Sequence, residues 1–383
     1  MKKLLCAALS AMLLVFSFAG CGNTGSNSGS KVIKIGVFEP TTGENGGGGQ
    51  LEVDGIKYAN SVKPTVEIGG EEYKIELEIV DNKSDKAEAA NAANYLVNAG
   101  VSAVLGSYGS GVSIAAGSIF ADAQIPAIGC SCTNPQVTLG NDYYFRVCFL
   151  DSFQAKVLAK HAVNEKRMKA AVLTQIGDDY SIGLGKFFEE AYKKFGGEVV
   201  SSQNFPANNA DFNALLQNIK NSGAQVVFAP SSITIAPVML QQAKSLGLEA
   251  IFMGADTWDN ADMVKAAGDA SEGLVASTFF NDEDESVADF VSGFKAYSKT
   301  DSINVVTALG YDAYMTAYEA IKAAGSTKGE DIKEALKNVT YQGVTGEIKF
   351  DENGDVSKDS AVIKSVQNGK LTYLATVKVD DVK

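Results

Sequence analysis

Histidine and tryptophan are almost absent from this chain, which has one of each among 383 residues. A single histidine leaves no Ser-His-Asp arrangement for nucleophilic catalysis and too few nitrogen ligands for a typical zinc site. The glycine run 46–49 continues into Gln50 and Leu51, so it lacks the Lys-Ser or Lys-Thr ending of a phosphate-binding loop. The sequence therefore argues against an enzyme, and we expect neither a cofactor nor a metal.

Basic residues are also scarce. Lysine and arginine number 33 against 46 acidic residues, which gives a formal charge of −13 and an isoelectric point near 4.7. Nucleic acids and anionic lipid surfaces bind basic patches, so neither is an expected partner, and a small-molecule ligand is favoured. No long apolar run follows residue 21, so we expect no transmembrane helix and assign any passage across a membrane to another protein.

Cysteine is rare after residue 21. The remaining part of the chain contains only Cys130, Cys132 and Cys148. Cys130 and Cys132 are too close in sequence for a relaxed disulfide along one strand end. We interpret the three as small buried residues. A bridge to Cys148 and a metal site remain as alternatives.

The N-terminus carries Lys2 and Lys3, then an apolar run that ends in Ala19-Gly20-Cys21. This pattern is typical of a secretory signal over residues 1–20. The segment resembles the bacterial lipobox, which implies that Cys21 is acylated and becomes the first mature residue; an ordinary cleaved signal is the alternative. Residues 21–30 have no apolar side chain after Cys21 and are predicted to form a flexible tether. We therefore expect a protein anchored by lipid alone at the extracytoplasmic face of a bacterial cell membrane.

From residue 31 onward, predicted strands and helices alternate, which is typical of parallel sheets covered on both faces. The alternation restarts after Arg146, so we predict an α/β fold with two doubly wound parallel-sheet lobes. Later helical segments and short strands predict a chain that returns to the first lobe and crosses back through a three-strand hinge. The predicted boundaries are 31–147 with 280–347 for lobe I and 148–279 with 348–383 for lobe II.

Polar and small residues follow two predicted strands of lobe I. Gly106-Ser107-Tyr108-Gly109-Ser110 comes after one strand, and Cys130-Ser131-Cys132-Thr133-Asn134 comes after the next. Ligands of such sheets bind at the carboxyl ends of the strands, where helix N-termini offer free amides to anions. Ser110 and Thr133, with these amides, are candidates for holding a carboxylate. Such turns also occur for purely geometric reasons, and that alternative stays open.

The matching strand ends of lobe II carry an acidic side chain and aromatic rings. They are Asp178-Asp179-Tyr180, Pro230-Ser231-Ser232 and Asp256-Thr257-Trp258. Asp256 is a candidate acceptor for a ligand ammonium group, and Tyr180 or Trp258 for covering the ligand. The alternative is that Asp256 caps a helix while Trp258 packs beneath it.

These motifs together resemble the leucine/isoleucine/valine-binding proteins of ABC importers, which are type I periplasmic binding proteins. The resemblance is carried by Gly-Ser-Tyr-Gly-Ser at 106–110, Ile-Pro-Ala-Ile-Gly-Cys-Ser-Cys-Thr-Asn-Pro at 125–135, Asp-Asp-Tyr-Ser at 178–181 and Gly-Ala-Asp-Thr-Trp at 254–258. It implies a receptor that closes on an amino acid and delivers it to an ABC permease with its ATPase. A sensor of the same fold that signals to a partner protein is the alternative, and a monomer is expected in either case.

Carried over by position, the resemblance implies ligand contacts from both lobes. Ser110 and Thr133 would hold the α-carboxylate, the main chain of Ser131 and the carboxylate of Asp256 the α-ammonium, and Tyr180 would lie over the ligand. The other candidate ligand-binding residues are Tyr108, Cys132, Ser232 and Trp258.

The glycines at 46–49 stand in what we expect to be a loop at the rim of lobe I, where family members often place a bulky side chain. Space there, with Tyr108 and Trp258 as aromatic surface, predicts a ligand longer than the branched-chain amino acids or aromatic. The alternative is that Tyr108 fills the space that the glycines leave.

Overall fold

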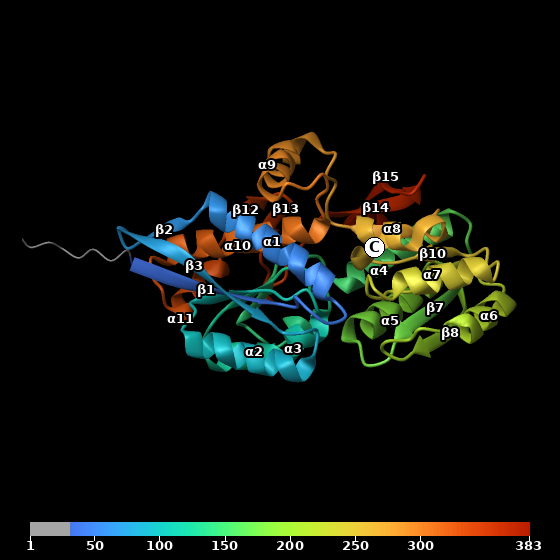
Figure 1. Ribbon diagram of the computed structural model, residues 1–383, viewed down its shortest axis with the longest axis horizontal. Helices are drawn as coiled ribbons and strands as arrows, with labels where there is room; N and C mark the ends of the chain where they lie inside the picture. The colour runs from blue at the N-terminus through green and yellow to red at the C-terminus, as the bar shows by residue number, and fades with distance from the viewer. Residues whose placement is uncertain (1–30) are drawn as a thin grey trace, which may run out of the picture.

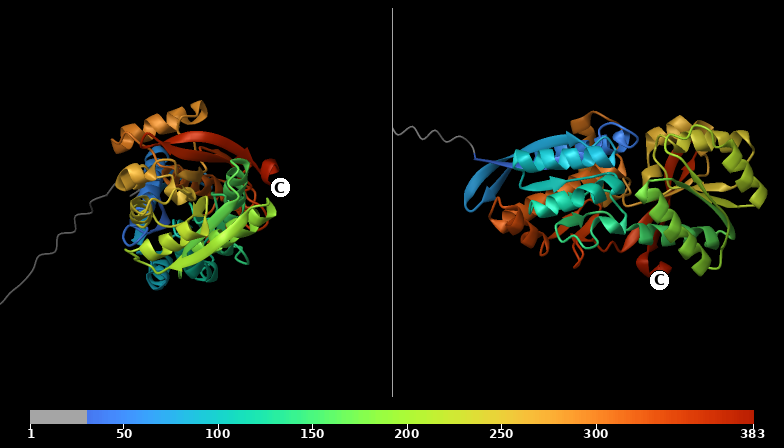
Figure 2. Two further views of the ribbon diagram at one scale, coloured as in Figure 1. Left: turned by 90° about the vertical axis from the view of Figure 1, so that its right-hand side faces the viewer. Right: turned by 90° about the horizontal axis from the view of Figure 1, so that it is seen from below.

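The computed structural model describes residues 31–383 as two α/β lobes side by side, joined by chain segments that cross between them (Figures 1 and 2). The predicted signal, the tether and Cys21 lie outside the described residues. Within the described residues no helix combines the length and the apolarity that a membrane span requires.

The first lobe contains a sheet in the order β2-β3-β1-β4-β5-β6, parallel except for β2 at one edge. Its strands are β1 (Lys31–Glu39), β2 (Thr65–Ile68), β3 (Glu71–Asp81), β4 (Ala103–Leu105), β5 (Ala127–Gly129) and β6 (Tyr144–Arg146). Helices on both faces bury the strands: α1 and α10 pack together on one face, with α11 beside α10, and α2 packs with α3 on the other (Figure 1). These helices are α1 (Gly46–Val62), α2 (Lys86–Ala99), α3 (Ser110–Asp122), α10 (Val305–Ala324) and α11 (Gly329–Leu336).

The second lobe repeats this topology. Its sheet has the order β15-β14-β11-β10-β9-β7-β8, so β8-β7-β9-β10-β11 corresponds to β3-β1-β4-β5-β6, with β14 and β15 added antiparallel. The strands are β7 (Lys169–Gln175), β8 (Glu198–Phe205), β9 (Val226–Phe228), β10 (Ile251–Met253), β11 (Val275–Thr278), β14 (Ser360–Gln367) and β15 (Lys370–Lys378). The helices are α4 (Asp151–Asn164), α5 (Asp179–Lys194), α6 (Asn213–Ser222), α7 (Ala236–Ser245) and α8 (Ala261–Ala267). The predicted fold class is confirmed.

The chain passes between the two sheets after β6, after β11 and before β14. Between the last two crossings, α9 (Ala288–Ser298), α10, α11 and the hairpin β12 (Thr340–Gly343) to β13 (Gly346–Lys349) belong with the first lobe, because α9 and α10 both pack on α1. Three crossings restrict the relative motion of the lobes to opening and closing about the hinge.

Local signals in the sequence place several elements correctly. Asp85 accepts hydrogen bonds from the amides of Ala87 and Glu88 and so caps α2, and Gly100 ends that helix with a left-handed φ of 72°. Cys130, Cys132 and Cys148 are all buried and unpaired, which confirms their interpretation as small core residues and not as a bridge.

The expected loop at 46–49 is wrong, because α1 begins at Gly46. Glycine disfavours helices, but tertiary packing requires it here. A Cβ atom on Gly49 would lie 2.1 Å from the carbonyl oxygen of Pro40, and one on Gly48 would lie 2.4 Å from the ring of Tyr108. The glycines therefore allow close packing of the start of α1, whose later turns bury Val53, Ile56 and Ala59.

Candidate functional site

The carboxyl ends of strands from both lobes meet at one small cavity. Its walls come from the turns after β1, β4 and β5 in the first lobe and after β7, β9 and β10 in the second. The lining residues are Asn45, Tyr108, Gly109, Ser110, Ser131, Asp178, Tyr180, Ser232, Asp256 and Thr257. The centre of a water-sized sphere can occupy about 30 Å³ of this space. One ordered water needs roughly 10–15 Å³, so the cavity has room for only a few atoms in this closed arrangement.

Polar contacts across the cleft hold the lobes together at this place. The ammonium of Lys86 lies 2.7 Å from a carboxylate oxygen of Asp179. The side-chain amide of Gln175 donates to Glu44 at 3.0 Å, and that of Asn134 donates to the carbonyl of Asp179 at 2.8 Å. The predicted meeting of strand ends from the two halves is therefore seen in the structure.

Six of the nine predicted ligand-binding residues line this cavity together, and Cys132, Thr133 and Trp258 do not. Trp258 is fully buried in the core of the second lobe, where its ring nitrogen donates to the carbonyl of Ser231 at 3.2 Å. Cys132 is buried in the core of the first lobe, and its carbonyl accepts from Arg146 at 2.8 Å. The positions of Trp258 and Cys132 do not support the expectation that their side chains contact a ligand. Both side chains pack in the apolar cores between sheet and helices.

Thr133 lies just behind the cavity wall and is fully buried. Its hydroxyl and Oδ2 of Asp151 lie near each other, yet in the described residues neither makes a hydrogen bond of normal geometry. A buried hydroxyl without a hydrogen bond costs about 1–3 kcal/mol of folding stability. Such a group close to a binding cavity is therefore a candidate for contacting a ligand. Among the described residues, the Thr133 hydroxyl lacks a hydrogen-bond partner of normal geometry.

Asp256 is the principal charged group of the cavity. It lies at the start of the single-turn helix Asp256–Trp258 and is 2% exposed. Its Oδ1 accepts from the amide of Gln154 and from the hydroxyl of Tyr180, each at 2.9 Å. No other described residue donates to Oδ2, which leaves that oxygen for a ligand. The alternative that Asp256 caps a helix is not seen, since Asn260 provides the cap of α8.

Burial controls the protonation of the acidic groups around the cavity. It raises the pKa of Asp256 to about 6, and burial together with the charge of Asp256 raises the pKa of Asp151 to about 7. It also raises the pKa of Tyr180, so that hydroxyl stays protonated and donates to Asp256. In the described residues no lysine or arginine lines this cavity. The site therefore favours a ligand that brings a positive charge and disfavours a simple anion.

Tyr108 occupies the space over the glycines of α1. Its ring, 8% exposed, lies where a side chain on Gly48 would be, and Ile233 from the second lobe approaches Gly47. The structure thus matches the alternative in which Tyr108 fills the vacated space. Trp258 is also buried in the core. Neither the free space at the glycines nor an exposed Trp258 ring is therefore present to favour a long or aromatic ligand.

Several functional positions escaped the sequence analysis. Gln154 orients Asp256 and is itself fixed by the hydroxyl of Ser277, which donates to its Oε1 at 2.9 Å. Asn45 and Thr257 line the cavity. Glu52 lies behind Ser131, which donates to it. Of these residues, only Glu52 could have been found from the sequence. It lies three residues after Gly49 and four before Ile56, which is the spacing of the buried face of α1.

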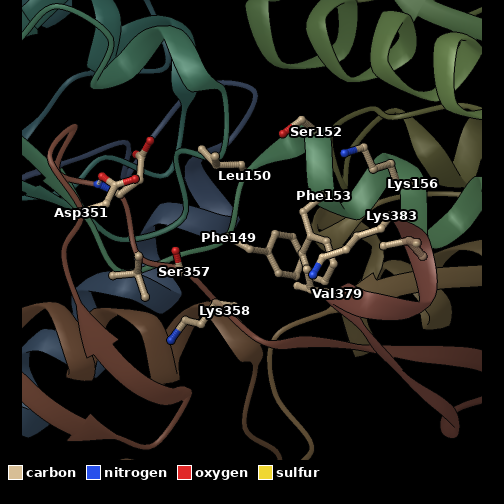
Figure 3. A pocket seen from close by; sticks show the side chains of 13 residues that line it. Phe149, Leu150, Ser152, Phe153, Lys156, Asp351, Ser357, Lys358, Val379 and Lys383 are labelled. Atoms are coloured by element: carbon tan, nitrogen blue, oxygen red, sulfur yellow. Dashed lines mark hydrogen bonds between the residues drawn. The ribbon is translucent and has the colours of Figure 1, made fainter.

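A larger cavity of about 260 Å³ lies at the hinge, away from the strand ends. Figure 3 shows its floor of Phe149 and Phe153, whose rings are 5.9 Å apart, with Lys156 and Lys358 at its edges. It is lined mainly by apolar surface and by crossing segments of the chain. It lacks the convergence of strand ends from both lobes that defines the first cavity.

A two-lobed solute-binding protein, with its site between the lobes, is the class that this fold and cavity define. The model of the periplasmic binding protein family matches residues 32–370, and the chain belongs to this family, among the leucine/isoleucine/valine-binding proteins. Proteins of this family bind solutes outside the cytoplasm and are not enzymes.

The relatives agree over nearly their whole length. The leucine-, isoleucine-, valine-, threonine-, and alanine-binding protein of Pseudomonas aeruginosa is 29% identical over 352 residues, which cover 91% of this chain and 93% of that protein. A leucine-binding protein structure from Thermotoga maritima has a TM-score of 0.85 at 32% identity and covers 91% of this chain and 100% of that one. A branched-chain amino acid transporter substrate-binding protein from Streptococcus pneumoniae, solved with isoleucine, has a TM-score of 0.84 at 29% identity, with the same coverage. A benzoate complex from Rhodopseudomonas palustris has a TM-score of 0.82 at 20% identity and shares the fold alone.

Proposed function

We propose that this protein captures a zwitterionic α-amino acid between its lobes and delivers it to an ABC permease. The observation that carries the proposal is the buried carboxylate of Asp256, with Oδ2 free, across the cavity from the hydroxyls of the first lobe. Similarity to amino acid receptors over nearly the whole chain supports it.

The two ligand charges have separate partners in this proposal. The α-ammonium binds Asp256 and the carbonyl of Ser131. The α-carboxylate binds Ser110, the Thr133 hydroxyl and the first amides of α3, a helix that begins at Ser110 and has no side-chain cap. Helix N-termini attract anions, so a carboxylate is stabilised there without a cationic side chain. The Tyr180 ring covers the ligand from the second lobe.

The side chain of the ligand is small in this proposal. The glycine run gives no extra room because Tyr108 covers it, and the closed cavity is narrow. In the lining, apolar surface comes from the rings of Tyr108 and Tyr180, while the other side chains are polar. A ligand of the size of valine or threonine fits this setting better than phenylalanine, and the polar lining gives threonine an advantage over isosteric valine.

Calorimetric competition among these ligands tests the assignment. We expect valine and threonine to bind at least about tenfold more tightly than phenylalanine, because enlarging a packed site costs about 1–3 kcal/mol. Isovalerate, which is valine without its amino group, is expected to bind at least about tenfold more weakly than valine, because Asp256 is then left unpaired. Equal affinity for valine and isovalerate would contradict the proposed function. A clear preference for phenylalanine would contradict only the assigned size.

Membrane attachment through Cys21 is the second part of the proposal. The lipobox-like segment would supply a lipid anchor, which would keep the protein near its permease. In cells, Cys21→Ala is expected to release the protein from the membrane fraction or to leave the signal uncleaved. Normal processing with full membrane retention would show that another feature anchors the protein. A role as a sensor is separated from transport by measuring amino acid uptake in cells that lack the gene.

A further inference from the structure

Two glutamates are buried side by side beneath the binding cavity. Glu39 ends β1 and Glu52 lies in the second turn of α1, and both are 0% exposed. Carboxylate oxygens of the two and the sulfur of Cys130 lie within 4.8 Å of one another. Two buried carboxylates at this separation cannot both be ionised without a large repulsion.

The hydrogen bonds of the pair leave one oxygen of each residue unused. Glu39 Oε2 accepts from the amide of Tyr108 at 2.7 Å, and Glu52 Oε1 accepts from the hydroxyl of Ser131. Glu39 Oε1 and Glu52 Oε2 are buried and have no hydrogen-bond donor of normal geometry in the described residues. A single proton shared between the two neighbouring carboxylates would give the pair a hydrogen bond and would remove one of the two negative charges.

We propose that Glu39 and Glu52 share one buried proton, and that this proton holds Tyr108 and Ser131 in the positions from which they contact the ligand. The pair thereby joins the turn after β4 to the turn after β5. Glu39 and Glu52 are positioning residues, since neither lines the cavity. The positioning of ligand contacts rests on the proposed function, whereas the shared proton does not.

Within residues 31–383, the cation near the pair's surroundings is Arg146, which acts on the neighbouring Cys132 and is itself paired with Asp355. Ionisable groups face the pair from the ends of β4 and β5, from β6 and from the second lobe; they are Tyr108, Cys130, Cys132, Tyr144 and Asp256. Burial raises the pKa of each of them, so the thiols and phenols are neutral at neutral pH. From α10, the residue packed against the backbone of Glu52 is Gly310. Burial likewise raises the pKa of Glu39 well above its usual value, which agrees with a retained proton.

Infrared spectroscopy of the full mature protein tests the shared proton without any ligand. At about pH 8, where ordinary glutamates are ionised, the wild type is expected to show a carboxylic acid carbonyl band that Glu39→Gln and Glu52→Gln remove. A missing band in the wild type, or a band that persists in both variants, would overturn the proposal. One equivalent of divalent metal in the purified wild type, lost in Glu39→Gln, would also overturn it and assign the site to a cation.

Binding measurements test the positioning role. Glu52→Gln can donate to Glu39 and accept from Ser131, so its affinity for valine and threonine is expected within about threefold of the wild type. Glu52→Leu leaves both neighbours unpaired, and a loss of about tenfold or more is expected. Asp312→Asn is the matched control, because Asp312 is a buried carboxylate of the same lobe whose partners, Val344 and Thr345, lie away from the cavity.

The pH profile separates positioning from general destabilisation. At alkaline pH, above the range in which the infrared band persists, the wild type loses the shared proton, so its affinity is expected to fall more steeply than that of Glu52→Gln, which has no such proton to lose. Deprotonation of the ligand ammonium affects both proteins equally. Parallel profiles, or wild-type affinity in Glu52→Leu, would overturn the positioning role. If the wild type binds no amino acid, the proposed function fails, and the infrared result still decides whether the proton is shared.

Discussion

Asp256→Asn will weaken amino acid binding by roughly 30-fold or more and will leave the melting temperature of the ligand-free protein unchanged or raised. Two carboxylates line the cavity in the described part of the chain, and both oxygens of Asp178 already accept from the amides of Tyr180 and Ser181. The loss follows from removing the other, Asp256, whose Oδ2 is available to the ligand ammonium, a change that typically costs 2–5 kcal/mol. The fold is preserved because asparagine keeps Oδ1 as acceptor for Gln154 and Tyr180. Calorimetry and thermal denaturation, after bound ligand has been removed by unfolding and refolding, measure the two effects.

The sign of the stability change follows from the pKa. Burial raises the pKa of Asp256 from its usual 3.8 to about 6, so the stability of the folded protein is greatest below the unfolded pKa and falls as pH rises through 6. At neutral pH the buried charge therefore costs about 3 kcal/mol, which asparagine avoids. Asp262→Asn, an exposed position in α8, is the control and is expected to change neither quantity. A lowered melting temperature with unchanged affinity would make Asp256 a purely structural residue.

The same pKa gives the affinity a pH dependence. As pH rises from about 5 to 8, Asp256 loses its proton and gains the charge that an ammonium ligand requires, so binding should tighten by up to about tenfold per pH unit while one proton is released. Asp151, whose pKa burial raises to about 7, lies beside Thr133, where its ionisation repels the ligand carboxylate and opposes this trend at higher pH. In Asp256→Asn the profile should be much flatter. A wild-type affinity that does not change over this range would contradict an ionised Asp256 as the ammonium partner.

Sequence patterns predicted the fold because each lobe repeats a local rule. Buried strands alternate with amphipathic helices, and caps such as Asp85 and stops such as Gly100 are encoded by residues next to them. The strand-end positions of Ser110, Tyr180 and Asp256 followed from the same rule, since parallel strands bring their carboxyl ends to one edge.

The rest depended on contacts between distant segments, which no local pattern encodes. The start of α1 looked like a loop because its glycines are explained only by Pro40 and Tyr108, which pack against them. Trp258 looked exposed at a strand end, but its environment is set by Gly254 and the carbonyl of Ser231. The glutamates 39 and 52 are 13 residues apart in sequence, and only the fold shows that they face each other.

Arg146 is the residue that connects the binding turn to the hinge. It is 0% exposed, and its Nε lies 2.6 Å from Asp355, in the crossing that leads to β14. Its other nitrogens donate to the carbonyls of Cys132 and Asn134, at 2.8 and 2.7 Å, and to the hydroxyl of Thr138. The guanidinium thus holds the turn that contains Thr133 while it pairs with a segment joining the lobes. A planar fork of donors suits these divergent acceptors, and a lysine ammonium does not.

Arg146→Met will therefore lower stability and affinity together, in contrast to Asp256→Asn. Breaking a buried ion pair costs about 3–5 kcal/mol, and for a chain of this size we expect the melting temperature to fall by roughly 5–10 °C. Affinity should fall at least about tenfold even well below the melting temperature, because the carbonyls around Thr133 lose their common donor. Arg146→Lys keeps the charge but not the fork, so it should resemble Arg146→Met more than the wild type. Arg167→Met, at the other arginine of the chain, is the matched control. If Arg146→Met is destabilised but binds with wild-type affinity, the role of Arg146 is limited to stabilising the hinge. The turn around Thr133 would then keep its shape without Arg146.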